Sequence, residues 1–415
     1  MSHFYHANEH QHSETREQNL LSRLADFITY AKNNSPYYQA ILANIDATNI
    51  TTRSQLATLP ITRKSDLLDI QKQQPPLGGL ASKSGHINRI FQSPGPIYDP
   101  ENCQQDWWRM GQAFYAAGFR AGELVQNCLS YHLTPGGFIL DSGARACGCV
   151  VIPAGPGQTD QQLDVIEDLH PQGYCGTPSF LKILLDKAQA TKRDVSSLKK
   201  ALVTGEALSH ELRELFKQQG INTLQAYASA DVGLIGYETI ADDGLIIAED
   251  LIVEIVRPGS LTPVADGEIG EVVITSFNTD YPLIRFATGD LSAIKPGQSA
   301  CGRTNMRIQG WLGRADQTTK IKGMFVHPQQ IERIRLSVKG IKKMRLVVKL
   351  QDHQDKMQLL CEYDQDQSEL TKLELTGLLL DNLKQYTKLN GSVELVELGS
   401  LADDGKVIDD QRVIG

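Results

Sequence analysis

The feature that most constrains the fold is a regular alternation of short apolar runs with longer amphipathic stretches, which begins near residue 123. The apolar runs have the length and composition of buried strands, and the stretches between them keep helical spacing. Strands that alternate with helices in this way form parallel sheets joined by crossover helices. The sequence therefore predicts an α/β fold. The expected strands are ELVQNCLS, CVVIPAG, GYCGTPS and LKKALVTGE, and the expected helices are GFILDSGARACG, DQQLDVIEDLH and FLKILLDKAQA.

The pattern changes twice further along the chain. AEDLIVEIVRPG and GEIGEVVITSF alternate with period two and predict a β-rich subdomain. After about residue 316, a helix start with Pro328 at its first position, two strands, a long helix and a last strand predict a compact α+β unit. A chain of 415 residues is long enough for two domains. We therefore expect a large domain over residues 1–316 and a small C-terminal domain over 317–415.

Charge and cysteine usage indicate where the protein works. The net charge of −8, from 49 acidic and 41 basic residues, gives no general attraction to nucleic acid or to an anionic membrane. Seven scattered cysteines are typical of reduced thiols rather than of a disulfide framework. No apolar run approaches the roughly 20 residues of a membrane-spanning helix. We expect a cytoplasmic protein without nucleic-acid or membrane partners, whose polar residues 1–18 form a flexible tail.

Four segments place Gly, Asp, Arg and Lys at expected strand ends and turns, where binding sites usually lie. Each segment alone is a weak signal, because Gly-Asp turns are common and are usually structural. The order and spacing of all four together are specific. The segments are TGEALSHELRELF (204–216), AYASADVG (226–233), PLIRFATGDL (282–291) and GRADQTTKIKGMFVHPQQIE (313–332).

This set resembles the adenylate-forming enzymes, and in particular the phenylacetate–coenzyme A ligase family. The resemblance runs from about residue 35 to the end of the chain. It implies a large AMP-binding domain with parallel sheets and a β-rich subdomain, and a small mobile C-terminal domain with a hinge near Asp316. Further matching segments are SPYYQAIL (35–42), LPITRKSDLL (59–68), IPAGPGQTDQQ (152–162), GTPSFLKILL (176–185) and GKVIDDQR (405–412).

The resemblance also implies an activity. Such an enzyme joins a carboxylic acid, aryl or acyl, to coenzyme A in two steps that use ATP and Mg²⁺. The carboxylate attacks the α-phosphate of ATP and expels pyrophosphate, and the thiol then attacks the acyl-adenylate. Both partners of the first step are anions, so the site must supply positive charge and directed N–H groups. Homodimers are common in the family.

The nucleoside end of the implied site looks intact. Asp290 would accept hydrogen bonds from both ribose hydroxyls, and Arg314 would contact ribose or phosphate. Small residues would let the backbone approach the adenine. Tyr227 would stack on the base, with a core tyrosine as an equal alternative. The remaining expected nucleotide-binding residues are Gly205, Glu206, Ala207 and Ser229.

The C-terminal segments carry two further expectations from the resemblance. Lys406 matches the lysine that the small domain brings in for adenylation, where it would bridge the carboxylate and the α-phosphate. The alternative is a solvated lysine in a loop. Gly323 would lie on the coenzyme A tunnel in the second orientation of the small domain, with a simple turn glycine as the alternative.

The chain departs from the family where the triphosphate would bind. The family's phosphate loop is a Ser/Thr/Gly-rich run that ends near a Lys, whereas residues 89–101 read RIFQSPGPIYDPE. Pro94 and Pro96 carry no N–H, which leaves Ser93 and Gly95 as the candidate phosphate-binding residues.

A second departure lies in AYASADVG. Ala230 stands where the family has a phosphate-binding Thr, and Asp231 replaces the Glu expected to hold Mg²⁺. Asp is one methylene shorter but can still bind Mg²⁺ if the metal or the backbone shifts. Asp231 is therefore the candidate metal ligand.

Three functions stay open. The first is a divergent acyl- or aryl-CoA ligase whose SPGP loop folds differently around the phosphates. The second is an adenylate-forming enzyme that does not use coenzyme A or that handles an already activated acyl group. The third is a non-catalytic nucleotide-binding relative. Tyr131, His132 and Phe138 fall where the family places part of its acid pocket, with a packed core histidine as the alternative for His132.

Overall fold

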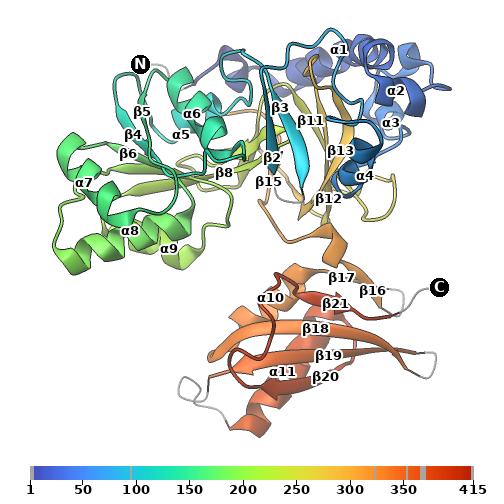
Figure 1. Cartoon of the computed structure of the whole chain (residues 1–415). Coiled ribbons are helices and arrows are strands. Elements are labelled where there is room, and N and C mark those ends of the chain that lie inside the picture. Colours follow the sequence, from blue (N-terminus) through green and yellow to red (C-terminus); the bar gives the residue numbers. More distant parts are fainter. Residues whose placement is uncertain (1–3, 94–95, 322–323, 352–353, 365–370, 413–415) are drawn as a thin grey trace. The chain divides into compact units, whose positions relative to one another are not determined.

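A computed structural model describes residues 4–93, 96–321, 324–351, 354–364 and 371–412 (Figure 1). The chain divides into two compact units. The first comprises Met1–Thr288 and Ser292–Trp311, and the second comprises Gly289–Leu291 and Leu312–Gly415. The residues around the predicted hinge at Asp316 thus belong to the small unit. In the part of the chain that the structure describes, no helix is long and apolar enough to cross a membrane.

A nine-stranded sheet organises the first unit, with the order β14-β15-β10-β9-β8-β7-β6-β4-β5. Its segment from β5 to β8 is parallel, which confirms the predicted α/β alternation. The strands are β4 (Leu124–Asn127), β5 (Val150–Pro153), β6 (Gly173–Gly176), β7 (Lys200–Val203), β8 (Asn222–Ser229), β9 (Gly233–Tyr237), β10 (Leu245–Ile247), β14 (Ile294–Lys295) and β15 (Arg307–Ile308). The associated helices are α6 (Gly136–Ala146), α7 (Thr159–Leu169), α8 (Pro178–Thr191) and α9 (His210–Gln218).

A second sheet of four strands, in the order β1-β13-β12-β11, forms the predicted β-rich part. Every residue of β11 and β12 is buried, which requires cover on both faces of these strands. Leu24 and Ile28 of the first long helix pack in one cluster with Ile252 and Ile284 of this sheet. The strands are β1 (Thr62–Arg63), β11 (Leu251–Val256), β12 (Gly270–Ser276) and β13 (Leu283–Ser292).

The remaining helices and a hairpin complete the first unit. The α-helices before the nine-stranded sheet are α1 (Ser13–Asn34), α2 (Pro36–Ile41), α3 (Arg53–Leu56), α4 (Leu67–Gln73) and α5 (Gly111–Ala116). The 3-10 helices are η1 (Ala7–His10), η2 (Ala47–Asn49) and η3 (Lys64–Asp66), with η4 (Ala315–Gln317) in the small unit. A separate antiparallel hairpin is formed by β2 (Arg89–Ser93) and β3 (Ile97–Glu101).

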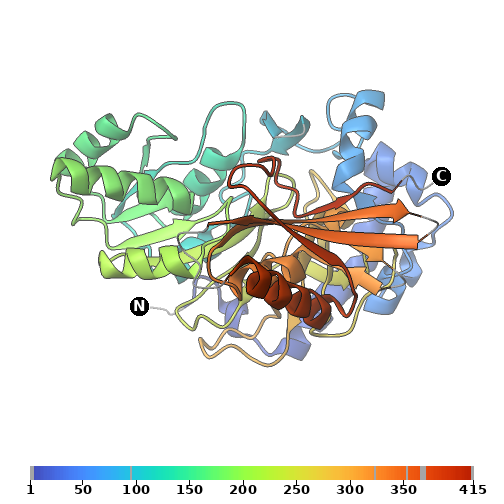
Figure 2. The same cartoon turned by 90° about the horizontal axis from the view of Figure 1, so that it is seen from below.

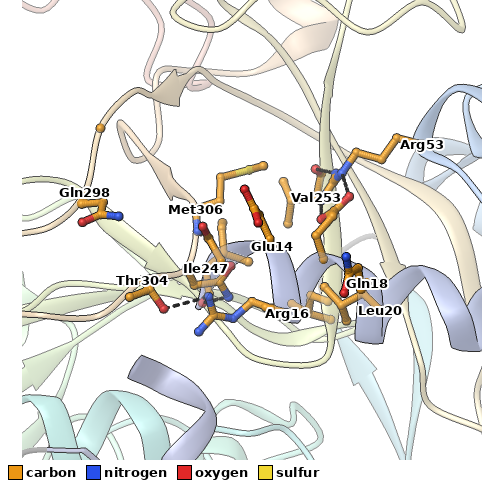
Figure 3. A pocket seen from close by; sticks show the side chains of 15 residues that line it. Glu14, Arg16, Gln18, Leu20, Arg53, Ile247, Val253, Gln298, Thr304 and Met306 are labelled. Atoms are coloured by element: carbon orange, nitrogen blue, oxygen red, sulfur yellow. Dashed lines mark hydrogen bonds and ion pairs between the residues drawn. The ribbon is translucent and has the colours of Figure 1, made fainter. Parts of the chain in front are cut away.

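The first 18 residues, expected to form a flexible tail, include two buried charged side chains among several exposed residues. Glu9 is buried and its carboxylate pairs with Nε of Arg303 at 2.8 Å. Arg16 is buried and pairs with Glu249 at 3.1 Å, and it also donates to the hydroxyl of Thr304 at 3.0 Å (Figure 3). Both charges are compensated by residues more than 230 positions away, and no local pattern can reveal such partners.

Figure 3 shows a cavity of about 630 Å³ beside this N-terminal segment. Its strongest charges already have partners within the protein. Arg53 donates to both carboxylate oxygens of Glu17, at 2.6 and 2.9 Å, and to the carbonyl of Val253. Arg53 of α3 thereby links α1 and α3 to β11.

The small unit contains a four-stranded sheet in the order β20-β19-β18-β21 (Figures 1 and 2). Its core joins buried leucines of the long helix, such as Leu379, to strand residues such as Leu346 and Leu359. As expected, a helix begins at Pro328. The elements are β16 (Thr319–Ile321), β17 (Met324–Val326), α10 (Pro328–Leu336), β18 (Ile341–Gln351), β19 (Gln354–Tyr363), α11 (Lys372–Thr387), β20 (Ser392–Val396) and β21 (Ile408–Asp410).

Candidate nucleotide site

The predicted adenine-binding residues lie at the carboxyl ends of two neighbouring parallel strands. β7 and β8 are paired from Lys200 with Asn222 to Val203 with Gln225, so both strands end at the same edge of the sheet. Gly205 follows β7 with φ of +82°, a conformation that a residue with a side chain adopts only with strain. Ligands of open α/β sheets bind outside this edge. The exposed residues Gly205, Glu206 and Ala207 and the strand residues Tyr227 and Ser229 therefore share one edge of the sheet.

Tyr227 and Ser229 also have contacts within the protein. The hydroxyl of Tyr227 donates to Oγ1 of Thr288 at 3.3 Å, and the ring is partly buried. Oγ of Ser229 accepts from the backbone N–H of Val232 at 3.2 Å and holds the turn that follows β8. Tyr227 thus has its hydroxyl anchored and its ring partly accessible, which is compatible with stacking on a base.

In the second unit, the predicted ribose and phosphate residues contact each other. Nη1 of Arg314 lies 3.2 Å from Oδ1 of Asp290, and the two backbones form a β-bridge. Nε of Arg314 lies 3.4 Å from Asp316. Gly289 has φ of +78°, a backbone conformation that a residue with a side chain adopts only with strain. The Gly-Asp pair of FATGDL therefore forms a turn that favours glycine.

A tight hairpin replaces the family's phosphate loop. β2 and β3 are paired from Arg89 with Glu101 to Ser93 with Ile97, so an antiparallel hairpin occupies this part of the chain. Ser93 is buried, and its hydroxyl donates to the carbonyl of Ile97 at 3.3 Å. The prediction of Ser93 as a phosphate ligand therefore does not fit the structure, because the hydroxyl is used within the hairpin. Gly95 lies outside the described residues.

A buried cluster of two acids and one lysine lies beside this hairpin. Nζ of Lys64 lies 2.5 Å from Oδ2 of Asp231, whose side chain is fully buried. Asp99 of β3 is also fully buried, and neither of its carboxylate oxygens has a hydrogen-bond partner among the residues that the structure describes. Burial and the nearby charge of Asp231 raise the pKa of Asp99 well above its usual range. Burial and the same two acids raise the pKa of Tyr281.

The geometry of Asp231 does not fit the predicted Mg²⁺ site. One oxygen is taken by the ammonium of Lys64, and the side chain is closed to solvent, whereas Mg²⁺ usually keeps several of its waters. Among the described residues, no group of three or more His, Cys, Asp or Glu side chains is placed to hold a metal ion. The charge of Asp231 is instead compensated by a lysine of the same chain.

The raised pKa of Asp99 makes the stability of the protein depend on pH. The folded state keeps a proton that the unfolded state releases above about pH 4, so this group's contribution falls as pH rises toward its folded pKa. Asn at this position cannot titrate. We expect the free energy of unfolding, measured in urea, to decrease less between pH 5 and pH 8 for Asp99→Asn than for the unmodified protein. Equal losses in the two proteins would contradict this account.

The second unit holds the predicted catalytic lysine. The side chain of Lys406 is 55% exposed, and its Nζ lies 3.4 Å from Oδ1 of Asp409. Its backbone N–H donates to Oδ1 of Asp404 at 3.0 Å, which shapes the loop before β21. Gly323, the predicted coenzyme A contact, lies outside the described residues.

The predicted acid-pocket residues have different surroundings. Tyr131 and Phe138 line a cavity of about 320 Å³, and their rings meet edge to face at 5.1 Å. Arg89 lies over the ring of Phe138 at 4.9 Å. His132 is exposed, so the alternative of a packed core histidine is wrong. The aromatic lining is compatible with an aryl or acyl group.

Sequence reasoning missed Lys64 and Asp99, although both lie in segments that it singled out. Lys64 is the lysine of LPITRKSDLL, and Asp99 follows SPGP in RIFQSPGPIYDPE. A carboxylate that closely follows an altered phosphate loop was the one local signal. The lysine that neutralises Asp231 comes from a position 167 residues away, which only the fold reveals.

Comparisons with known proteins identify related sequences and structures. A family model described as AMP-binding enzyme matches residues 119–279. A phenylacetate-coenzyme A ligase of Pseudomonas putida is 32% identical over 344 residues, which cover 79% of this chain and 77% of the relative. One of Thermus thermophilus is 28% identical over 360 residues, with coverage of 82% and 80%.

Among solved structures, 2-hydroxyisobutyryl-CoA ligase in an open conformation, in complex with 2-HIB-AMP and CoA, matches with a TM-score of 0.85. The match covers 99% of this chain and 95% of that chain at 22% identity. At this level of identity the likeness shows a shared fold.

Proposed function

The chain belongs to the phenylacetate–coenzyme A ligase family, and from this membership we infer that it is an AMP-forming acid–thiol ligase. A small carboxylic acid attacks the α-phosphate of ATP, the bond to pyrophosphate breaks, and an acyl-adenylate forms. The thiol of coenzyme A then attacks the acyl carbonyl and AMP leaves. Both steps need a site that binds AMP and neutralises anionic oxygens.

The observation that carries this proposal is that the nucleotide motifs lie next to each other within each unit. Gly205 and Tyr227 lie at the ends of neighbouring parallel strands, and Asp290 and Arg314 contact each other. We assign adenine binding to the first pair and ribose and phosphate binding to the second. A carboxylate accepts two hydroxyl donors well, and a guanidinium fork suits phosphate.

We assign Lys406 to the adenylation step, where its ammonium would bridge the attacking carboxylate and the α-phosphate. The lysine is more than half exposed, and its contact with Asp409 is long. An exposed ion pair of this kind contributes little energy, so exchanging it for phosphate oxygens costs little. The step is assigned to residues of this chain, and none of it depends on a metal held by Asp231.

The substrate is proposed by class, as an aryl or acyl acid. The aromatic lining around Tyr131 and Phe138 supports this class. A cytoplasmic location and a homodimer complete the proposal, and the net charge of −8 favours a small-molecule substrate over a nucleic-acid partner.

The decisive experiment is a pyrophosphate-release screen over aryl and fatty acids, with and without coenzyme A. Release that depends on both acid and coenzyme A would support the ligase. Release with acid alone would favour an adenylate-forming enzyme with another acceptor. No release and no exchange with any acid would favour a non-catalytic nucleotide-binding protein, against which Lys406 and Arg314 argue.

The hairpin favours the second candidate function, a site that handles an already activated acyl group. In sequence, SPGP includes two prolines, which lack N–H donors, and the hydroxyl of Ser93 donates to the carbonyl of Ile97. We therefore expect AMP to bind about as tightly as ATP in isothermal titration calorimetry, because the β- and γ-phosphates gain few hydrogen bonds. A preference for ATP of about tenfold or more would contradict this interpretation of the hairpin.

A further inference from the structure

The side-chain amide of Gln317 makes hydrogen bonds to the backbone on both sides of Lys406. Its Oε1 accepts the N–H of Val407 at 2.7 Å, and its Nε2 donates to the carbonyl of Gly405 at 3.0 Å. A carboxamide has an acceptor oxygen and a donor NH₂ group in one plane. It can therefore bind a backbone N–H and a backbone C=O at once, as a neighbouring β-strand does. Lys406 is the residue held between the two bonds.

Two other side chains, both from β18, also make hydrogen bonds to the same loop. Arg345 of β18 donates from Nε to the carbonyl of Lys406 at 3.2 Å and from Nη2 to that of Ala402 at 2.9 Å. Lys343 donates to Ala402 at 2.9 Å and pairs with Asp403 at 3.0 Å. These contacts tie the loop to the sheet of the small unit.

Gln317 differs from these anchors in where it sits along the chain. It is the last residue of η4 and follows Asp316, the predicted hinge, which is itself linked to Arg314. The residue that directly follows the predicted hinge therefore contacts the backbone of the lysine loop within the small unit. Gly405, with φ of +71°, has no side chain to limit the loop, so the two hydrogen bonds restrict it instead.

We propose that Gln317 is the positioning residue for Lys406, and that it couples the hinge segment to the lysine loop so that the two move as one piece. This inference depends on the proposed function, in which Lys406 acts in adenylation only. A displacement of about 1 Å in a reacting group can cost about 100-fold in rate, so loss of both bonds affects chemistry more than stability.

The test compares Gln317→Ala with Gln330→Ala. Gln330 is a matched control in the same unit, because its amide also makes two backbone hydrogen bonds, to His327 at 2.8 Å and to Tyr386 at 2.7 Å. With the acid that gives the strongest exchange in the screen, we expect Gln317→Ala to lower pyrophosphate exchange about 10- to 100-fold. KM for ATP should stay unchanged, and Gln330→Ala should keep its activity.

Two further measurements separate positioning from a structural effect. Thioester formation from the synthetic acyl-adenylate and coenzyme A should be unchanged in Gln317→Ala, because Lys406 does not act in that step. Hydrogen–deuterium exchange of a peptide covering residues 401–411 should be faster in Gln317→Ala than in Gln330→Ala, because the Val407 amide loses its acceptor.

The outcomes distinguish this inference from the proposed function. If Lys406→Ala abolishes exchange while both glutamine variants behave alike, the positioning role is wrong and the ligase stands. If Lys406→Ala keeps full activity, the assigned role of the lysine fails first. If no acid supports exchange, the hydrogen–deuterium measurement still decides whether Gln317 orders the loop, and equal rates in the two variants would overturn the coupling.

Discussion

Lys406→Ala is expected to lower carboxylate-dependent pyrophosphate exchange by at least about 100-fold while AMP binding stays measurable. In the proposed first step two anions must meet, and removing one positioned charge or donor from such a site typically costs a factor of about 100 to 1,000. The proposed ribose contacts of Asp290 and Arg314 do not involve the lysine. Exchange of labelled pyrophosphate into ATP measures the first effect, and calorimetry with AMP measures the second.

The matched control is Lys384→Ala, which removes an exposed lysine from α11 of the same unit. It should leave both exchange and AMP binding unchanged. Thioester formation from a synthetic acyl-adenylate should also survive Lys406→Ala, because the ammonium is assigned to adenylation alone. Retention of more than about a third of the exchange activity in Lys406→Ala would exclude the assigned role, since a removed transition-state contact costs far more.

Lys64→Met is expected to destabilise the protein by about 3 kcal/mol at neutral pH. The ammonium lies 2.5 Å from a carboxylate whose side chain is fully buried, and breaking a buried ion pair leaves an uncompensated charge, which typically costs about 3–5 kcal/mol. The nearby Asp99 cannot compensate the charge of Asp231, because it is itself a carboxyl group. Burial and the negative charge of Asp231 raise the pKa of Asp99. Equilibrium unfolding in urea measures the loss.

The cause of this loss can be isolated with a double-mutant cycle. Asp231→Asn in the Lys64→Met background removes the unpaired charge, so most of the lost stability should return, and the two substitutions should be strongly non-additive. Lys72→Met is the control, because Lys72 pairs with Asp69 at 3.6 Å on the exposed face of α4 and contributes little. Additive effects, or a Lys64→Met protein as stable as Lys72→Met, would show that Lys64 does not neutralise Asp231.

The same cycle bears on the metal. If Asp231 bound Mg²⁺, Asp231→Asn would weaken Mn²⁺ binding in the presence of nucleotide, as followed by electron paramagnetic resonance. With Lys64 as its partner, we expect no change. In that case the chain differs from the family in the cation that compensates this carboxylate, which is the ammonium of Lys64 in place of Mg²⁺.

Much of the fold could be predicted because its signals are local. The alternation after residue 123 predicts β4 to β8 with their crossover helices, since side-chain period and strand length are read within a few residues. Period-two segments predict β11 and β12, and Pro328 marks the start of α10. The polar composition of residues 1–18 gave no sign that Glu9 and Arg16 are buried against charges from distant segments.

The candidate site, like the fold, has a part that could be predicted from local sequence and a part that could not. By itself the sequence determined the family, the four nucleotide motifs, and the replacement of the phosphate loop by SPGP, because these are patterns of adjacent residues. Only the tertiary structure decided that Ser93 bonds within a hairpin, that Asp231 contacts Lys64, and that Gln317 holds the loop of Lys406. The pairing of a buried charge depends on which distant segments the fold brings within about 3 Å, and that distance has no signature in the linear order of residues.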